Sequence, residues 1–126
     1  MMRENELSKL IVDTSYRIHV ELGPGLFESV YEEIMHYELL RYGLHVDRQK
    51  EIPLIWKEVI LDRSFKADLI VENLVLIEIK SIETIASVHQ KQVLTYLRLT
   101  RLKLGLLINF NEQLIKNGIT RIVNNL

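Results

Sequence analysis

The chain has 126 residues, 48% of them hydrophobic and 26% charged, which is typical of one globular domain and too short for a catalytic domain plus a separate recognition domain. Its formal net charge of −1 gives no overall attraction to nucleic acid, so such binding would need a local basic patch or bound cations. Cysteine is absent, which excludes disulfides and thiolate metal sites and is consistent with a reducing, cytoplasmic setting. We find no signal-peptide core and no apolar stretch long enough to span a membrane, and we expect a single soluble domain over residues 1–126.

Two amphipathic helices are predicted at the start of the chain. From about Asn5 to Leu22, apolar residues recur at spacings typical of one helical face, and Gly23-Pro24-Gly25 ends this helix. A second helix is predicted from near Leu26 to about Arg41. Its buried stripe is expected to contain Phe27, Val30, Tyr31 and Ile34.

Residues 44–80 have a period of two and a Val/Ile/Leu-rich composition, which predicts an antiparallel meander. Turn-like breaks are expected at 56–58, 62–64 and 72–73.

A third helix is predicted over 87–101, with Val88 among its apolar contacts. The continuous apolar run 104–110 indicates a strand buried on both faces, and 119–123 is expected to add a short edge strand. This order of elements predicts an α/β domain with a mixed sheet flanked by helices.

Three ionisable residues interrupt the apolar strands, namely Asp68, Glu78 and Lys80. Burying charge is costly unless the charge is paired or bound to a metal, so this pattern suggests a functional site. Glu78 and Lys80 share one face of their strand because strand side chains alternate. Asp68 joins that face if the turn through residues 72–74 has an odd length, or if the Asp68 strand contains a bulge.

If these residues converge, Asp68 and Glu78 supply hard oxygen ligands that suit Mg²⁺ or Mn²⁺, together with the carbonyl of Ile79. Lys80 would then orient a metal-activated water and stabilise the charge that develops on phosphorus during phosphodiester hydrolysis. Glu28 is expected to be the third carboxylate, although a helix-capping role is equally consistent with its position. A purely structural ion network of Lys80 with Glu78 or Asp68 also remains open.

These residues resemble the core of the PD-(D/E)XK nuclease superfamily, with Ala67 where the name has proline. Residues 25–31 are similar to the signature of the GxxExxY family of small proteins related to it. The resemblance implies a restriction-endonuclease-like core, a divalent metal and nucleic acid as the substrate. It also implies catalytic support from Gln92 and Tyr96, which resemble the QxxxY element of RecB-like nucleases.

Four further residues are expected to contact substrate phosphates: His89, Lys66, Lys91 and Arg98. His89 could instead serve the helix end, and Glu32 is expected at the surface or as a partner of a ligand. The leading hypothesis is a metal-dependent nuclease. The alternative is a non-catalytic nucleic-acid-binding or assembly module that retains the fold, and a homodimer or protein partner is expected to supply specificity.

Overall fold

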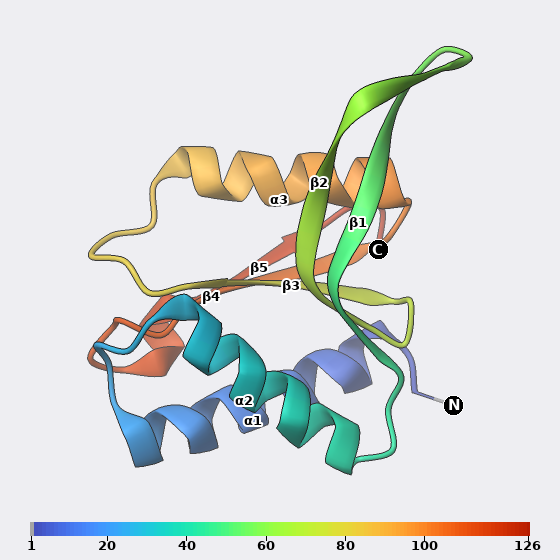
Figure 1. Ribbon diagram of the computed structural model, residues 1–126. Coiled ribbons are helices and arrows are strands. Elements are labelled where there is room, and N and C mark those ends of the chain that lie inside the picture. Colours follow the sequence, from blue (N-terminus) through green and yellow to red (C-terminus); the bar gives the residue numbers. More distant parts are fainter. Residues whose placement is uncertain (1) are drawn as a thin grey trace.

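The computed structural model describes residues 2–126 and shows one five-stranded sheet between two helical layers (Figure 1). Helices α1 (Glu4–Leu22) and α2 (Glu28–Arg41) cover one face of the sheet, and α3 (Ser87–Thr100) covers the other. The sheet order is β1-β2-β3-β4-β5, from β1 (Val46–Trp56), β2 (Val59–Val71), β3 (Val75–Lys80), β4 (Leu104–Asn109) and β5 (Ile119–Val123). A short 3-10 helix, η1 (Ile115–Gly118), precedes β5.

The strand directions confirm the predicted mixed sheet. Strands β1, β2 and β3 form the expected antiparallel meander, β4 runs parallel to β3, and β5 is the antiparallel edge strand. All six residues of β4 are buried, as expected for a strand between two others and between two helical layers. No helix within residues 2–126 combines the length and the apolar character needed to cross a membrane.

Two hydrophobic clusters hold the layers together. The larger one packs Leu7, Ile11 and Met35 of α1 and α2 against alternate residues of the central strands, such as Ile77. The smaller one packs α3 against the opposite face of the sheet. The alternation of the two clusters along β3 follows from the period of two in a strand.

The predicted start of α2 is wrong by two residues. Phe27 has extended backbone angles, φ −68° and ψ 151°, so the first helical residue is Glu28. The Phe27 side chain is 82% exposed and does not belong to the buried stripe, which contains Tyr31, Met35 and Leu39. Val88 is likewise exposed, because α3 buries Val93 and Leu97 instead.

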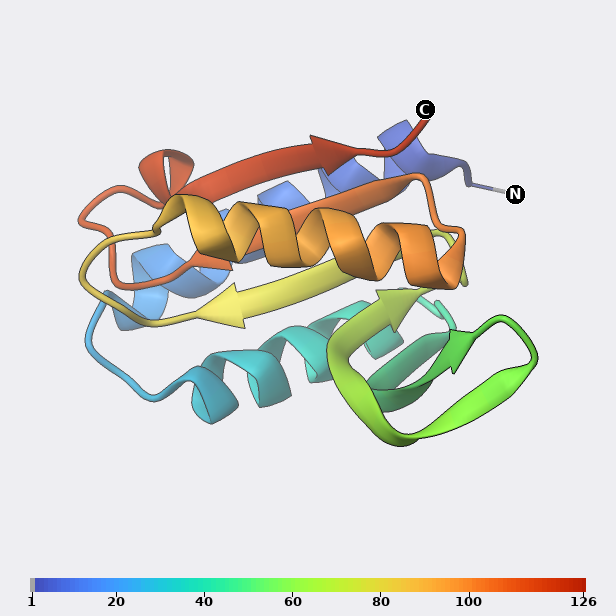
Figure 2. The ribbon, with the colours of Figure 1, turned by 90° about the horizontal axis from the view of Figure 1, so that it is seen from above.

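The break predicted at 62–64 is also wrong, because β2 continues through these residues. The sequence signal reflects a change of pairing: Pro53 pairs with Ser64, whereas Ile55 pairs with Ile60. Three residues of β2 therefore oppose the single Leu54 of β1, which is a bulge within a continuous hairpin. Beyond it, β1 and β2 extend away from the body of the fold as a two-stranded arm (Figures 1 and 2).

Candidate active site between β2 and β3

The turn between β2 and β3 sets the register of the acidic residues. Val71 pairs with Val75, so Glu72, Asn73 and Leu74 form a three-residue loop. Glu72 and Asn73 adopt left-handed backbone angles, with φ of 54° and 53°. This confirms the predicted odd-length turn.

The regular pairing of β2 with β3 ends at Leu69 and Ile77, and the next residues on the two strands are Asp68 and Glu78. Beyond that point, side chains take over the hydrogen bonds of the sheet. The backbone N–H of Ile79 donates to Asp68 Oδ2 at 2.8 Å, and the backbone N–H of Asp68 donates to Glu78 Oε1 at 3.3 Å. The two carboxylates therefore lie where β2 leaves the sheet, each fixed against the neighbouring strand.

Burial and mutual repulsion disfavour the charged forms of both acids. Burial raises the pKa of Asp68 to about 6, although the hydrogen bond from Ile79 partly opposes this and the charge of Glu32 adds to it. Burial and then the charge of Asp68 raise the pKa of Glu78 to about 8, although Lys80 opposes the rise. Glu78 is only 6% exposed. Near neutral pH the pair therefore carries less negative charge than two ordinary carboxylates, and it would gain from a nearby cation.

Two roles were expected for Glu32 of α2, a surface residue or a partner of a ligand. It is buried, which rules out the surface role, and Gln49 links it to the acidic pair. Its carboxylate accepts hydrogen bonds of 2.7 Å from Arg48 and from Gln49, and Gln49 also donates to Asp68 Oδ1 at 3.1 Å. Glu32 thus acts as a partner of a site residue, the second of the two roles expected for it. The available signal was its position next to Tyr31 and three residues before Met35, on the buried stripe of α2.

Glu28 lies at the end of β3 and not beside the acidic pair. Its Oε2 accepts a hydrogen bond of 3.2 Å from the backbone N–H of Ser81, the residue after Lys80. Within residues 2–126, no group of three or more His, Asp or Glu side chains is placed to hold a metal ion together. The structure therefore does not join Glu28 to Asp68 and Glu78 in a three-acid cluster.

The loop after β3 is held by a second strand. Asn109 is fully buried, pairs with Lys80 across β3 and β4, and exchanges side-chain hydrogen bonds with the backbone of Ile82 at 3.1 and 2.9 Å. The N–H of Phe110 also donates to the Lys80 carbonyl at 2.9 Å. These bonds hold the backbone at and after Lys80, a contact of Asn109 that the sequence did not reveal.

Helix α3 brings Tyr96 toward the acidic pair from the other layer. The pKa of Tyr96 is raised by burial and then by the charges of Glu78 and Asp68, which places its hydroxyl within their field. Its ring stacks on Phe65 of β2, with ring centroids 3.6 Å apart and planes inclined by 10°. Gln92, one turn earlier on α3, is exposed.

The residues expected to contact phosphate lie on β2 and α3. Lys66, Lys91 and Arg98 are exposed, and Lys66 is two residues from Asp68. His89 accepts a hydrogen bond of 2.8 Å at Nδ1 from the backbone N–H of Ala86, so it serves the start of α3. Its expected contact with phosphate remains a prediction.

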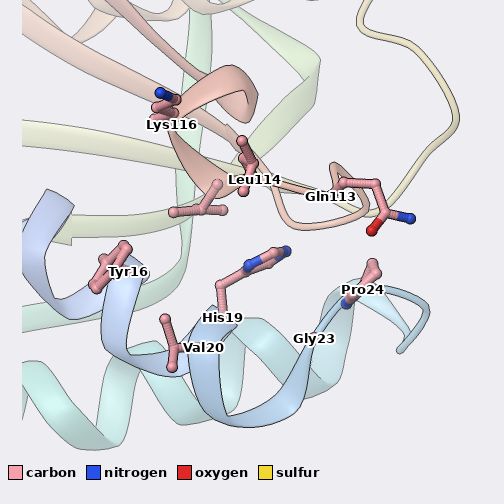
Figure 3. Close-up of a pocket in the computed structure, with 9 residues that line it drawn as sticks. Tyr16, His19, Val20, Gly23, Pro24, Gln113, Leu114 and Lys116 are labelled. Atoms are coloured by element: carbon pink, nitrogen blue, oxygen red, sulfur yellow. The ribbon is translucent and has the colours of Figure 1, made fainter.

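A separate hollow of about 450 Å³ lies between α1 and the segment around η1 (Figure 3). Among the described residues that line it, Tyr16, Val20 and Leu114 are apolar or aromatic, and none carries a carboxylate. His19 is part of its wall, but its Nε2 lies 2.7 Å from the carbonyl of Glu112 and is engaged there. This hollow lacks the acids that phosphodiester chemistry needs.

The donor atoms at the acidic pair fit a hard divalent cation. Asp68 and Glu78 provide carboxylate oxygens at a place where burial raises the pKa of both acids, and a bound cation would favour their charged forms. Mg²⁺ usually binds through one or two carboxylates and retains several waters, so two acids are sufficient.

Comparisons with known proteins agree with this geometry. A family model described as the PD-(D/E)XK nuclease superfamily matches residues 5–122. Neither the curated proteins nor the solved structures yield a significant match to the chain. The matched residues include the acidic pair and all three helices except the first residue of α1.

Proposed function

The chain belongs to the PD-(D/E)XK nuclease superfamily, and we propose that it is a divalent-metal-dependent nuclease that hydrolyses phosphodiester bonds in nucleic acid. The observation that carries this proposal is the pair Asp68 and Glu78, level on adjacent strands and both with a raised pKa, with Lys80 next on the same strand face. A purely structural pair would be expected to have full compensation by cations. Here the compensation is incomplete, which favours a site for an external cation.

Asp68 and Glu78 are proposed to hold the cation, Mg²⁺ or Mn²⁺, with the Ile79 carbonyl as a further oxygen donor. When bound, such an ion would supply a Lewis acid for the phosphoryl oxygen and lower the pKa of a water molecule. The protein's own contribution is to place this charge at a fixed point, because the Ile79 N–H and Gln49 restrain the Asp68 carboxylate. Gln49 in turn is held by Glu32.

Lys80 is proposed to stabilise the negative charge that develops on the phosphate in the transition state. Its proximity to Glu78 is evident from the lowering effect of its charge on the pKa of Glu78. The Tyr96 hydroxyl stays protonated, because its pKa is raised, and can donate a hydrogen bond to the substrate. Gln92 is proposed to support this interaction from the same helix, and His89, Lys66, Lys91 and Arg98 to contact the substrate backbone.

The finer resemblance to GxxExxY proteins is part of this proposal. Tyr31 donates from its hydroxyl to the Gly23 carbonyl at 2.6 Å, and Glu28 accepts from the N–H of Ser81. The signature would thus tie the loop before α2 to the end of β3. Glu28 is proposed to hold the backbone at the end of the strand that carries Glu78, apart from the acidic pair.

The experiment that tests the proposal pairs calorimetric titration of Mg²⁺ and Mn²⁺ with a cleavage assay on DNA and RNA, using wild type, Asp68→Asn and Lys80→Met. We expect wild type to bind metal and cleave, Asp68→Asn to lose both, and Lys80→Met to bind metal but cleave poorly. This split separates catalysis from metal binding. A wild-type protein that binds no metal even with nucleic acid present would refute the nuclease proposal and favour the alternative, a binding or assembly module.

A further inference from the structure

Phe27, immediately before α2, presents its aromatic ring to solvent. Its side chain is 82% exposed, the highest value among the large hydrophobic residues that the structure describes as exposed. Full exposure of a phenylalanine forgoes the free energy that burial of its ring would provide, about 2 kcal/mol. The position therefore calls for an explanation in terms of a ligand or of the loop that carries it.

The loop that carries Phe27 is held on both sides. The Tyr31 hydroxyl donates to the Gly23 carbonyl at 2.6 Å and accepts from the Leu26 N–H at 3.2 Å, and the Tyr31 ring is itself buried. Ser81 Oγ donates to the Leu26 carbonyl at 2.6 Å. The exposure of Phe27 therefore results from a fixed backbone and not from a loosely attached loop.

The same bonds place Phe27 near the proposed catalytic centre. Ser81 contacts both Leu26 and Glu28, the two neighbours of Phe27. Ser81 is three residues beyond Glu78, which corresponds to at most about 10 Å along an extended chain. Beside the ring lies an open hollow of about 540 Å³ whose lining includes the polar groups of Glu28, Ser29 and Asn111.

An aromatic face next to hydrogen-bonding groups is the arrangement that recognises an unpaired base. The ring stacks on the base, and carboxylate, hydroxyl and amide groups bind the base edge. A protein partner would instead favour a continuous apolar surface. The hollow beside Phe27 is mixed: Leu26 and Phe27 are its apolar side chains, and its polar ones are Glu28, Ser29, Ser81 and Asn111.

We propose that Phe27 and the adjoining hollow bind an unpaired nucleobase close to the scissile phosphate, so that single-stranded or frayed nucleic acid is the preferred substrate. This inference rests on the proposed nuclease function and adds the substrate class to it. Stacking on Phe27 would fix the nucleic-acid strand relative to Lys80 and the acidic pair. Ser81 provides the connection, because it follows Lys80 in the chain and is hydrogen-bonded to Leu26 and Glu28 on either side of Phe27.

The test measures kcat/KM for metal-dependent cleavage of a short oligothymidylate and of the same strand with stable abasic analogues flanking the scissile phosphate. Phe27→Ala should lower kcat/KM for the intact strand about 5- to 100-fold, in line with the contribution of one aromatic–base stack. Phe27→Tyr should restore it. The abasic strand should be a poor substrate for wild type and Phe27→Ala alike, because it has no base to stack. Ile60→Ala, which shortens an exposed apolar side chain on the two-stranded arm of β1 and β2, should change neither rate.

Each outcome has a distinct meaning. Cleavage by wild type with equal losses on both strands in Phe27→Ala would overturn base stacking and leave the nuclease proposal intact. A blunt duplex cleaved faster than the single strand by wild type would overturn the substrate class. Failure of wild type to cleave any strand would overturn the nuclease proposal, and this inference with it. Thermal unfolding of Phe27→Ala should match wild type, since the exposed ring contributes little to folding.

Discussion

Asp68 and Glu78 lie level on adjacent strands, and each carboxylate accepts a hydrogen bond from the backbone of the opposite strand. The Asp68 carboxylate accepts from the N–H of Ile79 at 2.8 Å, and the Glu78 carboxylate accepts from the N–H of Asp68 at 3.3 Å. The acids thus replace ladder hydrogen bonds where β2 turns away from β3. The sheet remains connected, but two like charges are held close together in a partly buried position. The site is therefore assembled at a cost in electrostatic repulsion, which a cation would remove.

The first prediction is that neutral replacement of either acid abolishes activity without loss of stability. Asp68→Asn and Glu78→Gln keep an oxygen for the backbone hydrogen bonds but remove one of the two repelling charges. Cleavage should fall about a hundredfold or more, because electrostatic stabilisation by a bound metal is worth several kcal/mol. The free energy of unfolding without metal, measured in urea at neutral pH, should be equal to or higher than that of wild type.

Asp62→Asn is the matched control, because Asp62 is an exposed acid on the same strand. It should change neither cleavage nor stability appreciably. A loss of several kcal/mol of stability in Glu78→Gln would show that Glu78 has a structural role and contradict the prediction.

The second prediction concerns pH. The folded pKa of Asp68 is about 6 and that of Glu78 about 8, both above their ordinary values of 3.8 and 4.5. Between about pH 4 and pH 8 the folded protein therefore binds more protons than the unfolded chain, and the contribution of this pair to stability falls as pH rises. At pH 8 the metal-free protein should therefore unfold at a lower temperature than it would if this pair of acids did not titrate.

The comparison of wild type with Glu78→Gln isolates this contribution, since other titrating groups are common to both proteins. From pH 5 to pH 8 the unfolding temperature of Glu78→Gln should rise relative to that of wild type. Addition of Mg²⁺ or Mn²⁺ should raise the unfolding temperature of wild type and reverse this difference. A difference that does not depend on pH would show that the Glu78 pKa is not raised.

The third prediction concerns Arg48, the cation that balances the buried Glu32. Its side chain is 32% exposed, and Nε lies 2.7 Å from Glu32 Oε2. Arg48→Met would leave Glu32 with its hydrogen bond from Gln49 but without its cation, and should lower the free energy of unfolding by about 1–3 kcal/mol because a buried charge loses its counterion. The unbalanced charge should also raise the pKa of Asp68 further and weaken metal-dependent cleavage at neutral pH.

Arg41→Met is the control for this experiment. Arg41 pairs with Glu38 at 3.4 Å but is 66% exposed, and surface ion pairs of this kind contribute about 0–1 kcal/mol. Equal effects of the two substitutions in urea unfolding would show that Glu32 does not depend on Arg48.

The sequence was sufficient to predict most of the fold because the apolar periods are strong. The run at β4 contains only one polar residue at its end, and the change from a period of 3.6 to a period of two after Gly43 marks the passage from helix to strand. For the register of β2 against β3, the sequence left two alternatives, because only a turn of odd length or a bulge brings Asp68 level with Glu78. The choice between them depended on the left-handed conformations of Glu72 and Asn73, which composition alone does not fix.

The remaining parts of the site depend on contacts between residues distant in the chain. Glu32 lies on the buried stripe of α2, but its partners Arg48 and Gln49 belong to a different element, and nothing within α2 indicates which residues they are. Phe27 was expected in the core because it continues an apolar pattern, but the helix begins one residue later and leaves the ring outside. The apolar pattern of a helix or strand identifies its buried face. The partners of a buried charge are determined by contacts between distant parts of the chain, which this pattern does not contain.

The last prediction concerns the close approach of α3 to β4 at Gly105. A Cβ at this position would lie 2.8 Å from Val93 Cγ1, closer than packed carbon atoms allow, whereas its distance of 3.4 Å from Leu97 Cδ1 is an ordinary contact. Gly105→Ala should therefore push α3 away from the sheet and lower the free energy of unfolding by about 1–3 kcal/mol. Because α3 carries Tyr96, cleavage should also decrease. The double variant Gly105→Ala/Val93→Ala should recover part of the stability lost, since the second change removes the clashing atom. Urea unfolding of the two single variants and the double variant measures this coupling, and strictly additive losses would contradict the proposed contact.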